Sequence, residues 1–178
     1  SLENAQYTLW SPKHVKMTIV QLKEKMDKPS DELLFVTAEL LRRGYSVSRV
    51  NEVTKIDHFF INKILNIVEH EELLKRMKLE DLSYDWLKKI KKLGFSDKGI
   101  SQLMSCEPDA IFNRRMQLGI VPSFKMVDTC SGEFEAVSPY YYSTYEDMDE
   151  VTISNREKVI VIGSGPIRIG QGVEFDYC

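Results

Sequence analysis

LLRRGYSVSRVNEVTKID (residues 40–57) and IKKLGFSDKGISQLMSCE (residues 90–107) are two copies of one pattern, separated by 50 residues without a gap. In each copy a helix-forming run ends at a glycine, an aromatic residue and a serine follow, and a short amphipathic run leads to an acidic residue. The offset pairs Leu40 with Ile90, Gly44 with Gly94, Val50 with Ile100, Val53 with Leu103, Asp57 with Glu107 and Ile61 with Ile111. Two copies are too few for a solenoid. The repeat therefore predicts two similar helical lobes, or two uses of a common helix-turn-helix arrangement.

Apolar residues recur at helical spacing from Ser11 to Gly119, which predicts about seven helices. The first is expected to run from Ser11-Pro12 to a point before Pro29, with Val15, Ile19, Leu22 and Met26 on one face. The second begins near residue 30, buries Leu33, Leu34, Phe35, Leu40 and Leu41, and stops at Gly44. A short helix over residues 48–54 precedes a long one from Asp57, with Phe60, Ile64, either Ile67 or Val68, and Leu74 on its apolar side. Trp86, Leu87, Ile90 and Leu93 mark the next helix, and two more follow Ser96 and Pro108.

The helical rhythm ends at Gly119. Residues 121–145 are expected to form extended or irregular chain, pinned by the packing of Tyr140, Tyr141, Tyr142 and Tyr145. The acidic run 146–150 is interpreted as a solvated connector. Residues 158–162 (KVIVI) have the pattern of a buried strand and lead into a glycine-rich loop.

Composition narrows the classes of protein that fit. The chain has 178 residues, 43% of them apolar, and a net charge of −3, which gives no bulk attraction to nucleic acid or to an anionic membrane. No apolar run approaches the ~20 residues that cross a bilayer. The N-terminus lacks the pattern of a secretory signal. Cys106, Cys130 and Cys178 are odd in number and far apart, so neither a disulfide framework nor a zinc site is expected. These features favour a cytoplasmic globular protein.

A helix-turn-helix DNA-binding regulator is the alternative that the repeat itself raises. Its first reading helix would begin at Asp57 with two phenylalanines and a single lysine, and its second carries acidic Glu107 and Asp109 at the same end. Because phosphate contacts dominate DNA affinity, this pattern favours helix packing over DNA binding.

No other constellation predicts chemistry within the helical region. His14, His58 and His70 have no ligand partners at metal spacing. Glu69, Glu71 and Glu72 are nearly consecutive on one helix and are expected to point in different directions. Lys88, Lys89, Lys91 and Lys92 alternate with apolar residues and are expected to lie on the outer face of an amphipathic helix. Cys130 is expected to be a packed or inert thiol. The sequence thus predicts no catalytic, metal or cofactor residue here.

The glycine-rich loop GSGPIRIGQG (residues 163–172) has the composition of a phosphate-binding turn. The dinucleotide fingerprint requires glycine where Arg168 stands, and the P-loop requires lysine where Gln171 stands. The loop is therefore neither standard motif.

Three segments together resemble the carbamoyl phosphate synthetase large-subunit family. KVIVIGSGPIRIGQGVEFDYC (residues 158–178) resembles the start of its second synthetase half, and KMVDTCSGEFEAVSPYYYSTYE (residues 125–146) resembles the segment just before that half. Residues 40–57 resemble the central helical domain of the same family.

The resemblance implies a mainly α fold: a helical oligomerization domain of two small lobes, with a truncated α/β start at the C-terminus. Expected boundaries are a cloning remnant at 1–2, the helical domain at 3–120, the tyrosine-rich segment and acidic linker at 121–157, and the truncated strand and loop at 158–178. Without the missing sheet neighbours, residues from about Ser154 onward are expected to be mobile or ordered only by a contact with another copy.

For the parent protein the resemblance implies an ATP-dependent ligase that makes carbamoyl phosphate from bicarbonate, glutamine-derived ammonia and two ATP, for arginine or pyrimidine biosynthesis. It implies ATP with Mg²⁺ or Mn²⁺ as cofactors, a glutaminase small subunit as partner, and self-association through the helical domain. Within this chain only Glu174 aligns with a family functional residue, a glutamate associated with the carbamate passage. A module that docks the glutaminase subunit is a further interpretation of the same region.

Overall fold

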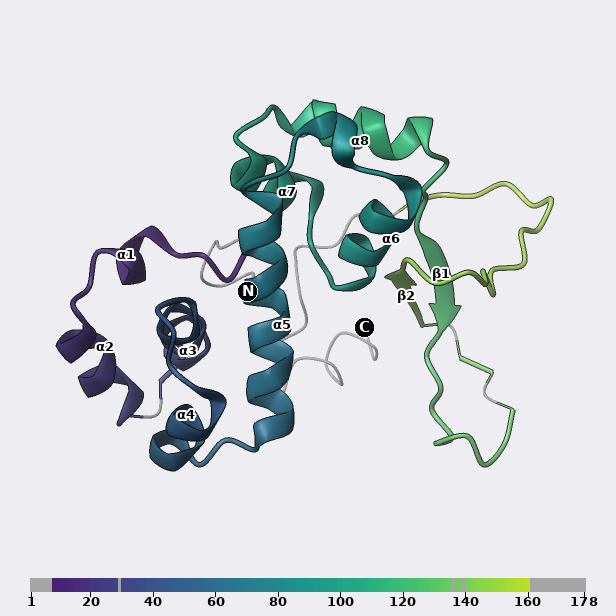
Figure 1. The fold of residues 1–178 in the computed structure, drawn as a ribbon. Helices are drawn as coiled ribbons and strands as arrows, with labels where there is room; N and C mark the ends of the chain where they lie inside the picture. The colour runs from purple at the N-terminus through teal and green to yellow at the C-terminus, as the bar shows by residue number, and fades with distance from the viewer. Residues whose placement is uncertain (1–7, 29, 136, 139, 161–178) are drawn as a thin grey trace.

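Eight α-helices precede a two-stranded antiparallel hairpin in the described part of the chain (Figure 1). The computed structural model describes residues 8–28, 30–135, 137–138 and 140–160. The helices are α1 (Pro12–Val15), α2 (Ile19–Met26), α3 (Leu33–Arg42), α4 (Val47–Thr54), α5 (His58–Leu74), α6 (Tyr84–Lys92), α7 (Asp97–Met104) and α8 (Pro108–Gln117), with a 3₁₀ turn η1 (Leu79–Asp81) before α6. The strands are β1 (Ser123–Met126) and β2 (Tyr141–Thr144). The prediction of a mainly α fold is confirmed.

Two separate apolar cores divide the helices into two lobes joined by α5 (Figure 1). The core of the first lobe (residues 11–65) contains Leu22, Met26, Val36, Leu40, Leu41, Val50 and Ile61. That of the second lobe (residues 67–120) contains Leu74, Leu82, Leu87, Ile90, Phe95, Ile100, Leu103, Ile111 and Ile120. Helix α5 has 17 residues and a length of roughly 25 Å, so it gives Ile61 to one core and Leu74 to the other. Each lobe therefore has its own apolar core, and helix α5 contributes to both cores.

The predicted repeat is present in the backbone of both lobes. Helices α4 and α7 begin and end 50 residues apart. The glycine that stops the preceding helix has φ of +86° at Gly44 and +92° at Gly94, a region that favours glycine. Ser46 and Ser96 then cap the short helices, since each side chain accepts a hydrogen bond from the backbone N–H three residues later. The prediction of two similar helical lobes is confirmed.

The structure corrects three details of the predicted helices. The first predicted helix is two helices, because Thr18 and Gln21 form a capping box that starts α2. Leu34 and Phe60, expected to be buried, are 43% and 60% exposed. The turn η1 is an element that apolar spacing does not predict, since three residues are too few to show a period.

The hairpin occupies part of the segment expected to be extended or irregular. Its register pairs Ser123 with Thr144 and Met126 with Tyr141. Aromatic packing holds it less than expected, because Tyr140, Tyr141 and Tyr142 are each nearly half exposed.

Several predictions concern the C-terminal segment. Residues 158–160 of the predicted strand have no strand assignment, and Val159 and Ile160 are exposed. The rest of that strand, the glycine-rich loop and Glu174 lie outside the described residues. The expected mobility of the chain after Ser154 stays a prediction.

Candidate functional site: two buried charge clusters and the strap

An acid-rich charge cluster lies between α3 and α5 and is organised by Arg42. The Arg42 guanidinium donates to Glu39 Oε2 at 2.6 Å and to Glu71, and it forms an ion pair with Glu72 at 3.4 Å. Arg43 donates to the other oxygen of Glu39 at 2.7 Å. Glu71 is fully buried. The neighbouring acids of α5 differ in environment, since Glu71 is buried and Glu72 is 37% exposed, although the long Arg42 side chain reaches both.

Glu71 also holds the N-terminal segment. Its Oε1 accepts a hydrogen bond from the backbone N–H of Leu9 at 2.9 Å. Burial raises the pKa of the Glu71 carboxyl, against the opposing effect of Arg42 and of the Leu9 amide. The cluster therefore concentrates negative charge that draws in donors from another part of the chain.

Two of the three histidines, His14 and His70, are buried in the lobes, whereas His58 is exposed. Buried His14 contacts Ser11 Oγ through Nδ1 at 2.9 Å, and burial lowers the pKa of its ring. His70 contacts the backbone carbonyl of Asn66 at 2.7 Å. No group of His, Cys, Asp and Glu that could hold a metal ion occurs among the described residues.

A second, cation-rich cluster lies inside the second lobe. Lys91 Nζ lies 2.9 Å from Asp97 Oδ1 and donates to the carbonyl of Phe95 at 2.6 Å. Arg115 donates to Asp97 Oδ2 from Nη2 at 3.1 Å and from Nε at 3.2 Å, and its Nη1 donates to the carbonyl of Ile120 at 2.8 Å. We call Lys91, Asp97 and Arg115 the triad.

The triad overturns one sequence prediction, because Lys91 is only 6% exposed rather than on a solvated face. Burial lowers the pKa of the Lys91 ammonium, and hydrogen bonding to Asp97 opposes this effect. For Asp97, burial alone would raise the pKa, but hydrogen bonds from Lys91 and Arg115 outweigh it and lower the pKa. The triad thus places two basic groups around one carboxylate.

Tyr145 covers the triad from the C-terminal side of the hairpin. The centre of its ring lies 5.0 Å from Lys91 Nζ and 5.9 Å from Arg115 Cζ, within the range of cation–π attraction. Burial raises the pKa of the Tyr145 hydroxyl. Tyr145 begins a six-residue segment, residues 145–150, that we call the strap.

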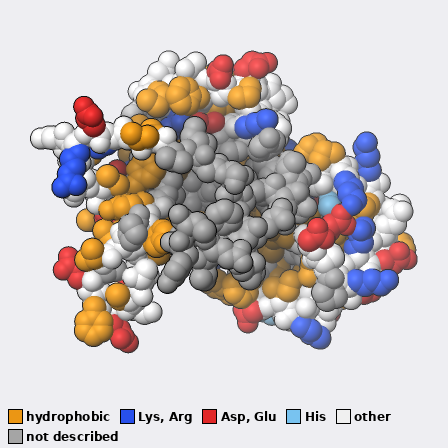
Figure 2. All heavy atoms as spheres, turned by 180° about the vertical axis from the view of Figure 1, so that it is seen from behind, with side chains coloured by type: hydrophobic (Ala, Val, Ile, Leu, Met, Phe, Trp, Pro, Cys, Tyr) orange, Lys and Arg blue, Asp and Glu red, His pale blue; other side chains and the backbone are white. Residues whose placement is uncertain are grey.

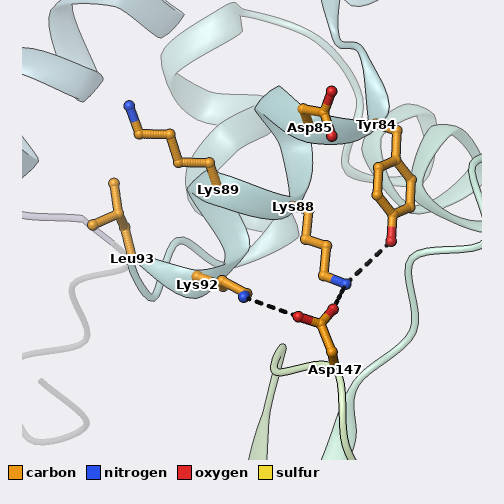
Figure 3. Close-up of a pocket in the computed structure, with 7 residues that line it drawn as sticks. All are labelled: Tyr84, Asp85, Lys88, Lys89, Lys92, Leu93 and Asp147. Carbon is orange, nitrogen blue, oxygen red and sulfur yellow. Dashed lines mark hydrogen bonds and ion pairs between the residues drawn. The ribbon is translucent and has the colours of Figure 1, made fainter.

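The acidic part of the strap meets the lysines of α6 (Figure 3). Asp147 reaches Lys88 and also lies 3.6 Å from Lys92, and Glu146 lies 3.3 Å from Lys92. The hydroxyl of Tyr84 accepts a hydrogen bond from Lys88 at 3.1 Å. Tyr84, Lys88, Lys92 and Asp147 line one open pocket of about 500 Å³. The expectation of a solvated connector is therefore only half right: Asp147 is 70% exposed, yet it is ion-paired.

Apolar and charged side chains divide the outer surface unevenly. On the face drawn in Figure 2, hydrophobic side chains gather on the side of the hairpin, and charged ones gather over the first lobe. Phe59 and Phe60, at the start of α5, are about 60% exposed, and Lys63 lies over the Phe59 ring. An exposed aromatic pair with one nearby cation does not form the cationic surface that DNA phosphates require.

Sequence reasoning missed the triad. The signal was the repeat itself: the 50-residue offset places Lys91, Asp97 and Arg115 on the apolar residues Leu41, Val47 and Leu65. Cys130, which is expected to be a packed or inert thiol, lies in an exposed loop, where its backbone N–H donates to Asp128 at 2.8 Å.

Comparison with known proteins identifies the family. Residues 1–119 match the family model described as the oligomerisation domain of the carbamoyl-phosphate synthetase large chain. The chain belongs to this family. Residues 155–178 match a second model, the preATP-grasp domain of carbamoyl phosphate synthase, so the hairpin and the strap lie between the two matched regions.

Whole-chain similarity points the same way. The carbamoyl phosphate synthase large chains of Clostridium botulinum (strain Eklund 17B / Type B) and Clostridium beijerinckii are 56% and 55% identical over 177 residues, which is 99% of this chain. That of Clostridium perfringens (strain SM101 / Type A) is 52% identical over the same length. The chain spans 17% of the length of these relatives. Its matched part is the oligomerisation domain, at residues 1–119, with the residues that follow it, and each relative named here carries the name carbamoyl phosphate synthase large chain. No described helix is long and apolar enough to cross a membrane.

Proposed function

We propose that this chain is the non-catalytic scaffold that links the two synthetase halves of a glutamine-dependent carbamoyl phosphate synthetase. The observation that carries the proposal is the order of the two family matches, with the oligomerisation domain at residues 1–119 and the preATP-grasp domain from residue 155. A mostly helical body with two buried charge clusters supports a structural role, because each charged group of the clusters is ion-paired with another side chain of the chain.

The parent enzyme is proposed to be an ATP-dependent ligase of the cytoplasm. It makes carbamoyl phosphate from bicarbonate, glutamine-derived ammonia and two ATP, with Mg²⁺ or Mn²⁺, for arginine or pyrimidine biosynthesis. Its partners are a glutaminase small subunit and further copies of the large chain. Glu174 is proposed to face the carbamate passage of that enzyme.

Three measurements test the scaffold role. Sedimentation of the purified chain is expected to show concentration-dependent self-association, and calorimetry is expected to show no binding of ATP–Mg²⁺. The complete large chain with its small subunit is expected to consume two ATP for each carbamoyl phosphate, whereas this chain with the small subunit makes none. ATP hydrolysis by the isolated chain would contradict the proposal, as would a strict monomer at every concentration.

A further inference from the structure

The second lobe is charged at a position where the first lobe is apolar. Leu41 is buried in the first core, and Val47 and Leu65 pack against it. This position in the fold is therefore stable without charge, and buried ion pairs are in general no more stabilising than well-packed apolar residues. The triad of the second lobe has an additional neighbour, the strap, which lies against it through Tyr145.

We propose that the triad is a docking socket for the strap, and that it fixes the point at which the chain leaves the helical domain for the region that matches the preATP-grasp domain. The proposal goes beyond the scaffold role, because it assigns a specific partner within the chain to the strap, which neither family match covers. It does not depend on the reaction of the parent enzyme.

Charge explains why the socket accepts an aromatic ring. Lys91 and Arg115 share the single carboxylate of Asp97, so one positive charge is left over inside the lobe. The face of an aromatic ring carries negative potential and attracts a cation without adding a second buried carboxylate. The tyrosine ring therefore complements the socket. The open groove of the other lobe that Leu41 and Leu65 line also contains two arginines and two glutamates, so no positive charge is in excess there.

Further contacts continue the docking along β1. Ser123 Oγ donates to the carbonyl of Glu146 at 3.0 Å, and the Glu150 N–H donates to the carbonyl of Phe124 at 2.9 Å. The ion pairs of Asp147 with α6 are exposed, and exposed pairs hold little by themselves. The half-buried contact of Tyr145 is thus the one expected to decide whether the strap is docked.

Docking shortens the reach of the next domain. From the end of the strap to residue 155, where the second family match begins, the chain has five residues, which span at most roughly 18 Å. If the strap were released, the last fixed point would be the end of β2 at Thr144, and the reach would grow to roughly 40 Å. The socket therefore confines the start of that domain to the neighbourhood of the second lobe.

Hydrogen exchange on the intact chain tests the socket, with the Glu150 amide as reporter. Tyr145→Ala is expected to speed exchange of that amide about tenfold or more and to leave α6, α7 and α8 within about twofold of the original protein, because the strap opens locally. Tyr145→Phe keeps the ring and is expected to behave like the original protein. Tyr142→Ala, at an exposed neighbour, is the matched control and is expected to leave the reporter unchanged.

The second variant replaces the triad with the residues found at the equivalent positions of the first lobe. Lys91→Leu, Asp97→Val and Arg115→Leu together give the second lobe the side chains of the first. The helices are expected to stay protected, while the Glu150 amide exchanges faster and a glutamate-specific protease cuts faster at Glu146. Unchanged strap protection in Tyr145→Ala or in the triple variant would overturn the proposal, and so would equal loss of protection across α6–α8 in Tyr145→Ala. If the triple variant does not fold, the Tyr145 variants decide alone.

Discussion

The two lobes repeat one backbone pattern, but the two charge clusters are built in opposite ways: carboxylates surround arginines in one, and two basic groups surround a carboxylate in the other. The acid-rich cluster, which joins α3 to the second half of α5, places the three carboxylates of Glu39, Glu71 and Glu72 around Arg42 and Arg43, and Lys75 pairs with Glu72 at its exposed edge. In the second lobe, the triad gathers two cations around one carboxylate, so bases are in excess. Each cluster then takes a complementary group from a segment outside the helices.

The N-terminal segment and the strap are those two segments. The acid-rich cluster accepts the backbone N–H of Leu9, whereas the cation-rich triad holds the ring of Tyr145. A donor meets the carboxylates, and an electron-rich face meets the cations. The comparison shows that the same helical arrangement can bind either the segment that precedes it or the segment that follows it. The kind of charge in the cluster decides which segment is bound.

The largest expected effect comes from removing the centre of the acid-rich cluster. Arg42→Ala leaves buried Glu39 and Glu71 without their shared cation, so the free energy of unfolding is expected to fall by about 3–5 kcal/mol. Denaturant unfolding followed by circular dichroism measures the loss. Lys75→Ala, which removes an exposed partner of Glu72, is the control and is expected to change it by less than about 1 kcal/mol. Equal losses would show that the cluster is not held by Arg42.

A matched pair of substitutions sharpens the comparison between lobes. Asp97→Ala leaves Lys91 and Arg115 buried without a counter-charge and is expected to cost about 3 kcal/mol. Val47→Ala, at the equivalent position of the first lobe, removes only two methyl groups from a half-buried side chain and is expected to cost about 1 kcal/mol. The same unfolding measurement compares them. A larger cost for Val47→Ala would mean that the triad is of no structural consequence.

The turn glycines give a smaller effect that should be equal in both lobes. An added Cβ at Gly44 or at Gly94 meets no atom within 4 Å, so the only penalty is the left-handed backbone. Each glycine-to-alanine substitution is expected to cost about 1–2 kcal/mol, and the double variant the sum. If the two single substitutions differed in cost by more than about 1 kcal/mol, the two turns would not be structurally equivalent.

Local signals explain why the frame is predictable from the sequence. Gly44 and Gly94 stop helices, and Ser46 and Ser96 start them, each within a few residues of the feature that it controls. The break before α2 could also have been found, because Thr18 and Gln21 have the spacing of a capping box, but the apolar period continues across it and hides it.

Tertiary partners explain what the sequence does not show. Lys91 is buried because Arg115 and Asp97, on two other helices, complete its environment, and no pattern within α6 contains that information. The hairpin has the same difficulty, since its register joins Ser123 to Thr144 across a long connection. Glu174 lies outside the described residues, so its place stays a prediction.

The opposite arrangements of charge also predict opposite responses to acid. The pKa of Glu71 is raised in the folded protein, so between the folded and the unfolded values the native state binds more protons. Its contribution to stability is therefore lost as pH rises through the folded pKa and regained as pH falls toward the unfolded value near 4.5. The pKa of Asp97 is lowered, so its contribution is present above the unfolded value near 3.8 and is lost as pH falls through the folded pKa.

Difference measurements separate these responses from the rest of the chain, including Glu32, whose pKa is lowered to about 2 mainly by hydrogen bonds from Lys13 and Lys25. Relative to the original protein, Glu71→Gln is expected to lose the gain in unfolding free energy on acidification from pH 7 toward 4.5. Asp97→Asn is expected to reduce the loss of unfolding free energy below pH 4. It is expected to leave the pH dependence above pH 4 unchanged, because the pKa of Asp97 is shifted downward from about 3.8. Denaturant midpoints at pH 7, 5, 4 and 3 check both variants. Shifts of the same sign in both would mean that the two clusters do not differ in their arrangement of charge.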